Sequence, residues 1–144
     1  HKPIVRFGAG TTLTFRQPLQ PDYRLRENDP VYVDVGPVWP DRELGLEYEG
    51  DYGDTFVLGE NPEAERCAES ARALFTEARG LWRSKGLSGA EIYAWLKQRS
   101  AELNYVLVEN VEGHRLGDFP HQKYSKERLA KVAFVPGDSL WVLE

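Results

Sequence analysis

The chain has 144 residues, with 18 Lys and Arg against 23 Asp and Glu, and its formal net charge of −5 argues against a nucleic-acid binder that relies on a basic face. Hydrophobic residues make up 41% and aromatic residues 12%, which excludes a disordered tail, and the length predicts one domain. The single cysteine excludes an internal disulfide and indicates a reducing compartment, the cytoplasm, while no apolar run approaches the roughly 20 residues that a membrane span needs.

Both ends of the sequence indicate a piece of a longer protein. The chain starts at His1, contains no methionine, and stops on the apolar run 141–143 and Glu144, with no polar tail. We therefore expect residues 1–144 to form a single domain that is incomplete and truncated at both ends.

The first part of the chain has the composition of strands. Two short runs, at residues 3–8 and 11–15, are rich in residues that favour strands. A third run, 31–35, is dense in valine, and a fourth covers residues 52–58. Between these last two, residues 40–50 are acidic and predict a loop.

Two helices are predicted from their start signals and their apolar spacing. Asn61 followed by Pro62 is typical of a helix start, and apolar residues then recur at helical spacing as far as Trp82. Ser88 and Glu91 form a capping box at the start of a second helix. Three further strands are expected, at residues 104–111, 131–135 and 139–144. Strands before and after a pair of helices indicate an α+β fold with mostly antiparallel strands.

Three carboxylates stand in or next to apolar runs, where an unpaired charge is costly. Asp34 interrupts the valine-rich strand, and Glu144 ends the last apolar run. Asp51 begins the next strand, and two adjacent antiparallel strands would place it beside Asp34, where the carboxylates repel each other unless a proton or cation lies between them. The alternative is that Asp51 belongs to a solvated acidic loop and that Asp34 caps a turn.

Two of the three histidines, His114 and His121, lie seven residues apart in a loop rich in Gly and Pro. Taken alone, they are interpreted as surface histidines, because they are not on a helix and no helical spacing brings them together. Together with the isolated acids, one such histidine completes a set of oxygen and nitrogen ligands that suits Mn, Co, Fe or Zn. Several carboxylates among few histidines favour a two-metal site over a single zinc.

Four segments, in this order, carry a resemblance to a known family. They are Val-Asp-Val-Gly at 33–36, the run from Gly50 to Gly59, Gly-His-Arg-Leu-Gly at 113–117 with His121 after it, and the ending from Pro136 to Glu144. With these segments the chain resembles the pita-bread metallopeptidases, which include methionine aminopeptidase, aminopeptidase P and prolidase, with creatinase as a non-peptidase relative. The resemblance spans residues 30–144, and its specificity lies in the combination of segments.

The resemblance implies a fold and a role for each site residue. The implied fold is the pita-bread (creatinase/aminopeptidase) fold, a curved antiparallel sheet with helices on its outer face and the metals at its centre. The implied metal ligands are Asp34, Asp51, His114 and Glu144. Of these, Asp51 bridges two ions and Glu144 also helps to activate the water. His121 is implied to contact the substrate and steady the tetrahedral intermediate, and a last metal-binding glutamate is expected after Glu144.

The expected function is that of a metal-dependent hydrolase resembling aminopeptidases, which removes N-terminal residues from peptides through a metal-activated hydroxide. The expected cofactors are two divalent ions, Mn, Co, Fe or Zn. The substrate is expected to be a peptide or a small molecule, with no nucleic-acid or membrane partner, and a homodimer stays open.

Three departures from the family pattern support an alternative function, a non-catalytic pita-bread module with a degraded site that binds a peptide or a protein. Arg115 replaces a glycine, Gln122 stands where a glutamate is common, and residues 40–50 are an acidic insertion. Retention of His114 and His121 argues against this alternative. A creatinase-like enzyme that acts on a small molecule is a third hypothesis, which the sequence leaves open.

Overall fold

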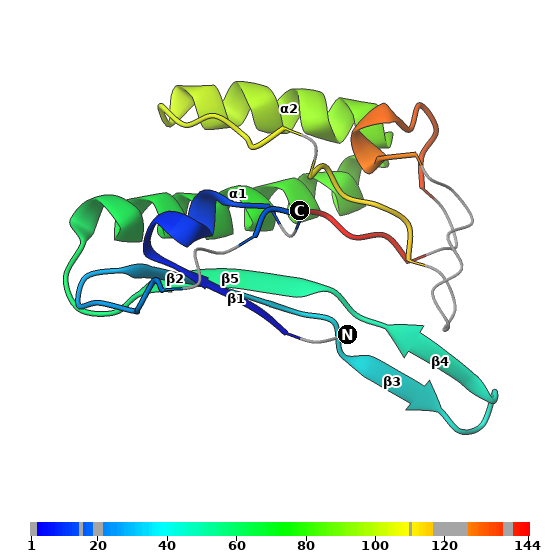
Figure 1. Ribbon diagram of the computed structural model, residues 1–144. Coiled ribbons are helices and arrows are strands. Elements are labelled where there is room, and N and C mark those ends of the chain that lie inside the picture. The colour runs from blue at the N-terminus through cyan, green and yellow to red at the C-terminus, as the bar shows by residue number, and fades with distance from the viewer. Residues whose placement is uncertain (1–2, 15, 19–21, 110, 117–126, 137–139) are drawn as a thin grey trace. The chain divides into compact units, whose positions relative to one another are not determined.

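The computed structural model describes residues 3–14, 16–18, 22–109, 111–116, 127–136 and 140–144 (Figure 1). Over these residues the fold is α+β, with antiparallel strands and two α-helices, as the sequence predicts. Its elements are β1 (Ile4–Phe7), β2 (Pro30–Val35), β3 (Val38–Asp41), β4 (Leu46–Glu49), β5 (Tyr52–Val57), α1 (Pro62–Lys85) and α2 (Gly89–Glu102). The chain divides into two compact units, His1–Pro37 with Gly50–Glu69 and Val38–Glu49 with Ser70–Glu144.

The first unit is built on a three-stranded antiparallel sheet in the order β1-β2-β5 (Figure 1). The predicted strands at 3–8, 31–35 and 52–58 are confirmed within two residues at each end. In β2 the valines alternate with Tyr32 and Asp34, so the valines share one face and the two polar residues share the other. Asp34 therefore lies on a defined face of the sheet, opposite Gly53 of β5.

The strand predicted at 11–15 is wrong over its described residues, because Gly8–Thr12 form a 3₁₀ helix and Thr14 lies in no strand. The hydroxyl of Thr11 donates to the carbonyl of Gly8 at 2.8 Å, and the hydroxyl of Thr12 donates to that of Ala9 at 2.9 Å. Threonine favours strands on average, but here its hydroxyl bonds the local backbone and competes with strand pairing.

The acidic loop predicted at 40–50 is also wrong, because most of it forms a β-hairpin of β3 and β4. Trp39 pairs with Tyr48 across the hairpin. The carboxylate of Asp41 accepts the backbone N–H groups of Glu43 and Leu44, each at 3.0 Å, which closes the turn. The many charged residues led to the prediction of a loop. The aromatic pair of Trp39 and Tyr48, one on each side of the turn, is the feature of the sequence that indicates a hairpin.

Both predicted helix starts are confirmed. The side chain of Asn61 accepts the backbone N–H of Ala64 at 3.1 Å at the start of α1. At α2, the backbone N–H of Ser88 donates to the Glu91 carboxylate at 2.8 Å, and the Glu91 N–H donates to the Ser88 hydroxyl at 3.2 Å. The Ser88 hydroxyl also donates to the Glu91 carboxylate at 2.6 Å, and this bond, together with that from the Ser88 N–H, lowers the pKa of the Glu91 carboxyl.

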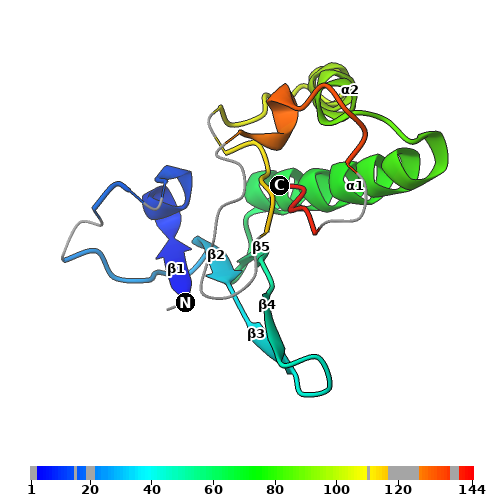
Figure 2. The same ribbon diagram turned by 90° about the vertical axis from the view of Figure 1, so that its right-hand side faces the viewer.

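The core of the second unit lies where α2 crosses the later part of α1 (Figure 2). Its buried members are Leu74, Ala78, Ile92, Tyr93, Leu96, Leu129 and Val132. Trp82 of α1 and Trp95 of α2 are partly buried and pack against this cluster. Arg99 of α2 forms an ion pair with Glu77 of α1, with Nε and Oε2 3.0 Å apart.

The strands predicted at 104–111, 131–135 and 139–144 are wrong for the residues that the structure describes there. Leu129–Lys131 form a short 3₁₀ helix, and Arg115 and Trp141 form an isolated antiparallel bridge. The backbone N–H of Leu129 donates to the Gly113 carbonyl at 2.7 Å, and that of Ala90 donates to the Val132 carbonyl at 2.9 Å. Backbone groups of these segments are thus bonded one by one to neighbouring segments, without the ladder that defines a strand.

Within the described residues, neither α-helix has the length and apolar character that crossing a membrane requires.

Candidate functional site

Asp34 and Asp51 lie on the same face of the sheet in the first unit. Asp34 is opposite Gly53 in the pairing of β2 with β5, and Asp51 precedes Gly53 by two residues. Residues two apart in an extended chain face the same way, so the two carboxylates are diagonal neighbours. The sequence prediction that adjacent strands place these two acids close together agrees with this register.

The environment of Asp34 disfavours its charged form. Burial raises the pKa of the Asp34 carboxyl above its usual value, and the nearby charge of Asp51 raises it further. A hydrogen bond with the side chain of Tyr32 acts in the opposite direction. A cation beside the two carboxylates would relieve the repulsion that the charge of Asp51 exerts on Asp34.

Gly53, the residue opposite Asp34, has no side chain, and this leaves space beside the two carboxylates. A Cβ atom at that position would lie 3.0 Å from the hydroxyl of Tyr32. The strand residue opposite Asp34 thus leaves room for Tyr32, whose side chain bonds the carboxylate.

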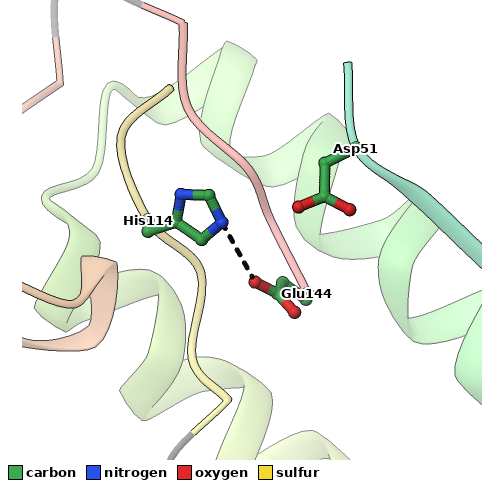
Figure 3. Close-up of side chains that lie close together, drawn as sticks. All are labelled: Asp51, His114 and Glu144. Carbon is green, nitrogen blue, oxygen red and sulfur yellow. Dashed lines mark ion pairs between the residues drawn. The ribbon is translucent and has the colours of Figure 1, made fainter. Parts of the chain in front are cut away.

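His114 and Glu144 form a second diagonal pair, in the second unit. The backbone N–H of Val142 donates to the His114 carbonyl at 2.8 Å, and that of Leu116 donates to the Leu140 carbonyl at 2.9 Å. His114 is therefore opposite Val142, and Glu144 follows Val142 by two residues. The two side chains point toward each other, with Nε2 of His114 3.8 Å from Oε1 of Glu144 (Figure 3).

The orientation of the His114 ring suits a metal ligand. Its Nδ1 lies 3.2 Å from the backbone carbonyl oxygen of Arg115, a contact that favours a proton on Nδ1. In that tautomer the lone pair of Nε2 faces Glu144. Histidines that bind metals commonly donate their second ring N–H to a backbone carbonyl in this way.

The spacing of the pair also fits an ion. At 3.8 Å, the two atoms are too far apart for a hydrogen bond. Two atoms that each lie about 2.0–2.2 Å from one metal ion are at most about 4.4 Å apart. His114 and Glu144 therefore fit a divalent ion as a pair of ligands, and oxygen with imidazole nitrogen is the donor mixture that Zn, Mn, Co and Fe accept.

One residue beside this pair was missed by the sequence reasoning. Tyr93 of α2 is buried, and its hydroxyl donates to the backbone carbonyl of Glu144 at 2.5 Å. Burial raises the pKa of the Tyr93 phenol well above its usual value, so the group stays a hydrogen-bond donor. In the sequence, Tyr93 is recognisable only as the neighbour of the inward-facing Ile92. That position predicts a core residue and gives no indication of a role at the site.

The remaining predicted site residue, His121, lies outside the described residues, as does Gln122. Arg115 lies in the bridge with Trp141, directly after the proposed ligand His114.

Comparison with protein families gives a match over nearly the whole chain. The model of Metallopeptidase family M24 matches residues 1–140. Neither the curated proteins nor the solved structures give a significant match.

Proposed function

Because the chain belongs to metallopeptidase family M24, we propose that it is an aminopeptidase-type metallopeptidase that removes N-terminal residues from peptides. Family membership confirms the resemblance inferred from the sequence motifs. It implies the pita-bread fold, a metal-dependent peptidase-like hydrolase and the use of divalent metal ions. The N-terminal specificity and a site with two ions are the finer part of the proposal.

The proposed metal ligands are Asp34, Asp51, His114 and Glu144. The single observation that carries the proposal is the His114–Glu144 pair, whose Nε2 and Oε1 atoms are spaced at 3.8 Å to share an ion. The diagonal pair of Asp34 and Asp51, with the raised pKa of Asp34, supports it independently, because a cation would relieve the repulsion.

Divalent ions held by these residues would supply an activated hydroxide and polarise the scissile carbonyl of the substrate. In the proposed reaction, the carboxylate of Glu144 accepts a proton from the attacking water, which is general base chemistry. The imidazole of His121 donates a hydrogen bond to the oxyanion that develops on the substrate carbonyl. The role of His121 rests on the resemblance alone.

Metal content tests the proposal directly. We expect the natural full-length protein that contains these residues to hold about two ions per chain after loading with Mn²⁺ or Co²⁺, measured by elemental analysis. D51N and H114A should each lower this content, whereas E43Q, a change in the exposed turn between β3 and β4, should not. A content below about 0.2 ion per chain in the unsubstituted protein would contradict metal binding.

The second candidate function is the non-catalytic module that binds a peptide or a protein. The observation that favours it is the hairpin of β3 and β4, which exposes Trp39 at 74% and Leu44 at 65%. An open hollow of about 510 Å³ is lined by Trp39, Pro40, Asp41, Arg42 and Glu43. Apolar side chains exposed beside polar ones are typical of binding surfaces.

A peptide-cleavage screen separates the two functions. The aminopeptidase should release N-terminal residues in a reaction that a chelator stops and that H121A slows. Peptide binding without cleavage, unaffected by the chelator, would favour the module instead.

We also propose a cytoplasmic location, which the single cysteine of the sequence supports. We likewise propose that the protein has no nucleic-acid or membrane partner and that it can form a homodimer. The mass of the protein in solution tests the homodimer.

A further inference from the structure

Tyr93 connects the most regular part of the second unit to the segment that ends in Glu144. The residue lies in α2, next to Ile92, and only 3% of its surface is exposed. Its hydroxyl donates to the Glu144 backbone carbonyl at 2.5 Å, across 51 positions of the sequence. A tyrosine has few rotatable bonds, so a buried ring on a capped helix holds its hydroxyl in a narrow range of positions.

The same hydroxyl lies beside the residue that precedes His114. A Cβ atom at Gly113 would lie 3.1 Å from the Tyr93 hydroxyl and would overlap the Val142 carbonyl oxygen. Only a residue without a side chain lets the segment before His114 pass this closely to the segment that carries Glu144. The Tyr93 hydroxyl thus stands where the two ligand-bearing segments meet.

These segments have little regular structure of their own. Arg115 and Trp141 form an isolated bridge, and the N–H of Leu129 donates to the Gly113 carbonyl at 2.7 Å. Backbone joined by one bridge and the two hydrogen bonds beside it has more freedom than backbone in a longer ladder, and an anchor on a packed helix restricts that freedom.

We propose that Tyr93 is a positioning residue for the metal centre, which sets the separation of His114 and Glu144 through the Glu144 carbonyl. The proposal rests on the proposed function and goes beyond it, since Tyr93 supplies no ligand atom. Phenylalanine at this position keeps the ring and removes only the hydroxyl. The loss of one buried hydrogen bond that holds a ligand in place should weaken metal binding by about tenfold.

The experiment compares Y93F with the unsubstituted full-length protein and with Y105F. Tyr105 is a half-buried tyrosine just after α2, and its hydroxyl forms no hydrogen bond within the part of the chain that the structure describes. Calorimetric titration with Co²⁺ gives the dissociation constant, and the visible absorption of bound Co²⁺ reports the ligand geometry. We expect Y93F to bind Co²⁺ about tenfold more weakly, with a changed absorption band, and Y105F to match the unsubstituted protein.

A merely structural role of Tyr93 gives a different result. Y93F would then melt at a lower temperature yet keep the dissociation constant and the Co²⁺ absorption band, and this outcome would overturn the proposal. If the unsubstituted protein binds no Co²⁺, the proposed function fails and the positioning role falls with it. Binding by the unsubstituted protein that Y93F leaves unchanged removes the positioning role alone.

A second measurement covers the case in which Y93F does not fold. Site-specific incorporation of 3-fluorotyrosine keeps the hydroxyl and adds an ¹⁹F signal at position 93 or 105. Loading with Zn²⁺ should shift the signal at 93 and leave that at 105 in place, because Tyr93, unlike Tyr105, bonds a ligand residue in the part of the chain that the structure describes. A signal at 93 that does not move on loading would rule out the coupling.

Discussion

The two units present their candidate ligands in the same way and support them differently. In the first unit, Asp34 is opposite Gly53, two residues from Asp51, and in the second, His114 is opposite Val142, two residues from Glu144. Each pair is therefore diagonal across antiparallel backbone. The pairing of β2 with β5 continues over six residues of each strand, whereas Arg115 and Trp141 form an isolated bridge.

The difference shows two ways to hold a pair of side chains at a site. A ladder with several equivalent hydrogen bonds holds Asp34, and Asp51 directly precedes the first paired residue of β5, so the removal of any one contact changes little. The segments of His114 and Glu144 depend on the helices and core behind them, through Tyr93 and Leu129. We therefore expect the second pair to be more sensitive to changes in packing than the first.

The largest effect is expected for L129A. Leu129 is fully buried in the core of the second unit, and its N–H holds the Gly113 carbonyl. Removing its side chain should cost about 2–5 kcal/mol in the free energy of unfolding. Hydrogen exchange should show the loss in amides of the second unit more than in those of β2 and β5. L44A, at a position that is 65% exposed, is the control and should change stability by less than about 0.5 kcal/mol.

The next largest loss of stability is expected for G113A in the second unit, and it is compared with that of G53A in the first unit. In G113A the new Cβ would overlap the Val142 carbonyl oxygen, so backbone has to move, at a cost of about 1–3 kcal/mol. In G53A the nearest atom is the Tyr32 hydroxyl at 3.0 Å, the end of a side chain that can shift, so the cost should stay below about 1 kcal/mol. Urea unfolding measures both, and equal losses would contradict the comparison.

A smaller loss of stability is expected for a change at the start of α2, the helix that carries Tyr93. S88A removes the N-cap and should lower the free energy of unfolding by about 1 kcal/mol at pH 7. The Ser88 hydroxyl and backbone N–H lower the pKa of the Glu91 carboxyl, so the part of this contribution that comes from the hydroxyl bond to the charged carboxylate is fully present above the unfolded value of 4.5 and is lost as the pH falls through the lower folded value. The difference between S88A and the unsubstituted protein should therefore shrink in acid.

Denaturation at several pH values measures this dependence. S84A is the control, because Ser84 is an exposed serine near the end of α1. A difference between S88A and the unsubstituted protein that stays constant from pH 7 to well below pH 4 would rule out the Ser88 hydroxyl bond to the Glu91 carboxylate as part of its source.

The smallest effect, and the only gain, is expected for D34N. The pKa of Asp34 is raised in the folded protein by burial and by Asp51, so the charged form destabilises the fold at pH 7. Asparagine should raise the free energy of unfolding by about 0.5 kcal/mol at pH 7, the scale of partly exposed charge pairs. The gain should disappear as the pH falls through the folded pKa toward the unfolded value of 3.8, where the carboxyl is protonated in both states.

D34N should at the same time lose metal affinity, because an amide is a weaker ligand than a carboxylate. D22N, a change at an exposed position of the same unit, is the control for both measurements. A loss of stability in D34N at pH 7 would show that folding favours the charged Asp34 carboxylate, which is incompatible with a raised pKa.

The sequence reasoning succeeded where local chemistry decides the structure. The valines of β2 alternate with Tyr32 and Asp34, and Asn61 and Ser88 cap their helices through bonds that span three residues. It failed at Thr11 and Thr12, whose hydroxyls bond the local backbone, and it missed the hairpin of β3 and β4. Average propensity is a poor guide where a single local hydrogen bond or a turn decides.

The four motifs were enough to predict the family, and their resemblance to it proposes Asp34, Asp51, His114 and Glu144 as metal ligands. Tyr93 carried no such signal, because its hydrogen bond joins residues 51 positions apart and depends on how α2 packs. The same holds for Gly113, whose close approach to Val142 is visible only once the two segments are in place.

By itself, the sequence determined the residue types that can bind metal, the family and the helices, because each depends on the order of neighbouring residues. Only the tertiary structure decided that His114 and Glu144 face each other and that a buried tyrosine holds the backbone of one of them. It also decided that the segments of His114 and Glu144 are joined by an isolated bridge with a hydrogen bond on each side of it. These features arise when distant segments pack together, and packing depends on the shape and burial of many side chains at once.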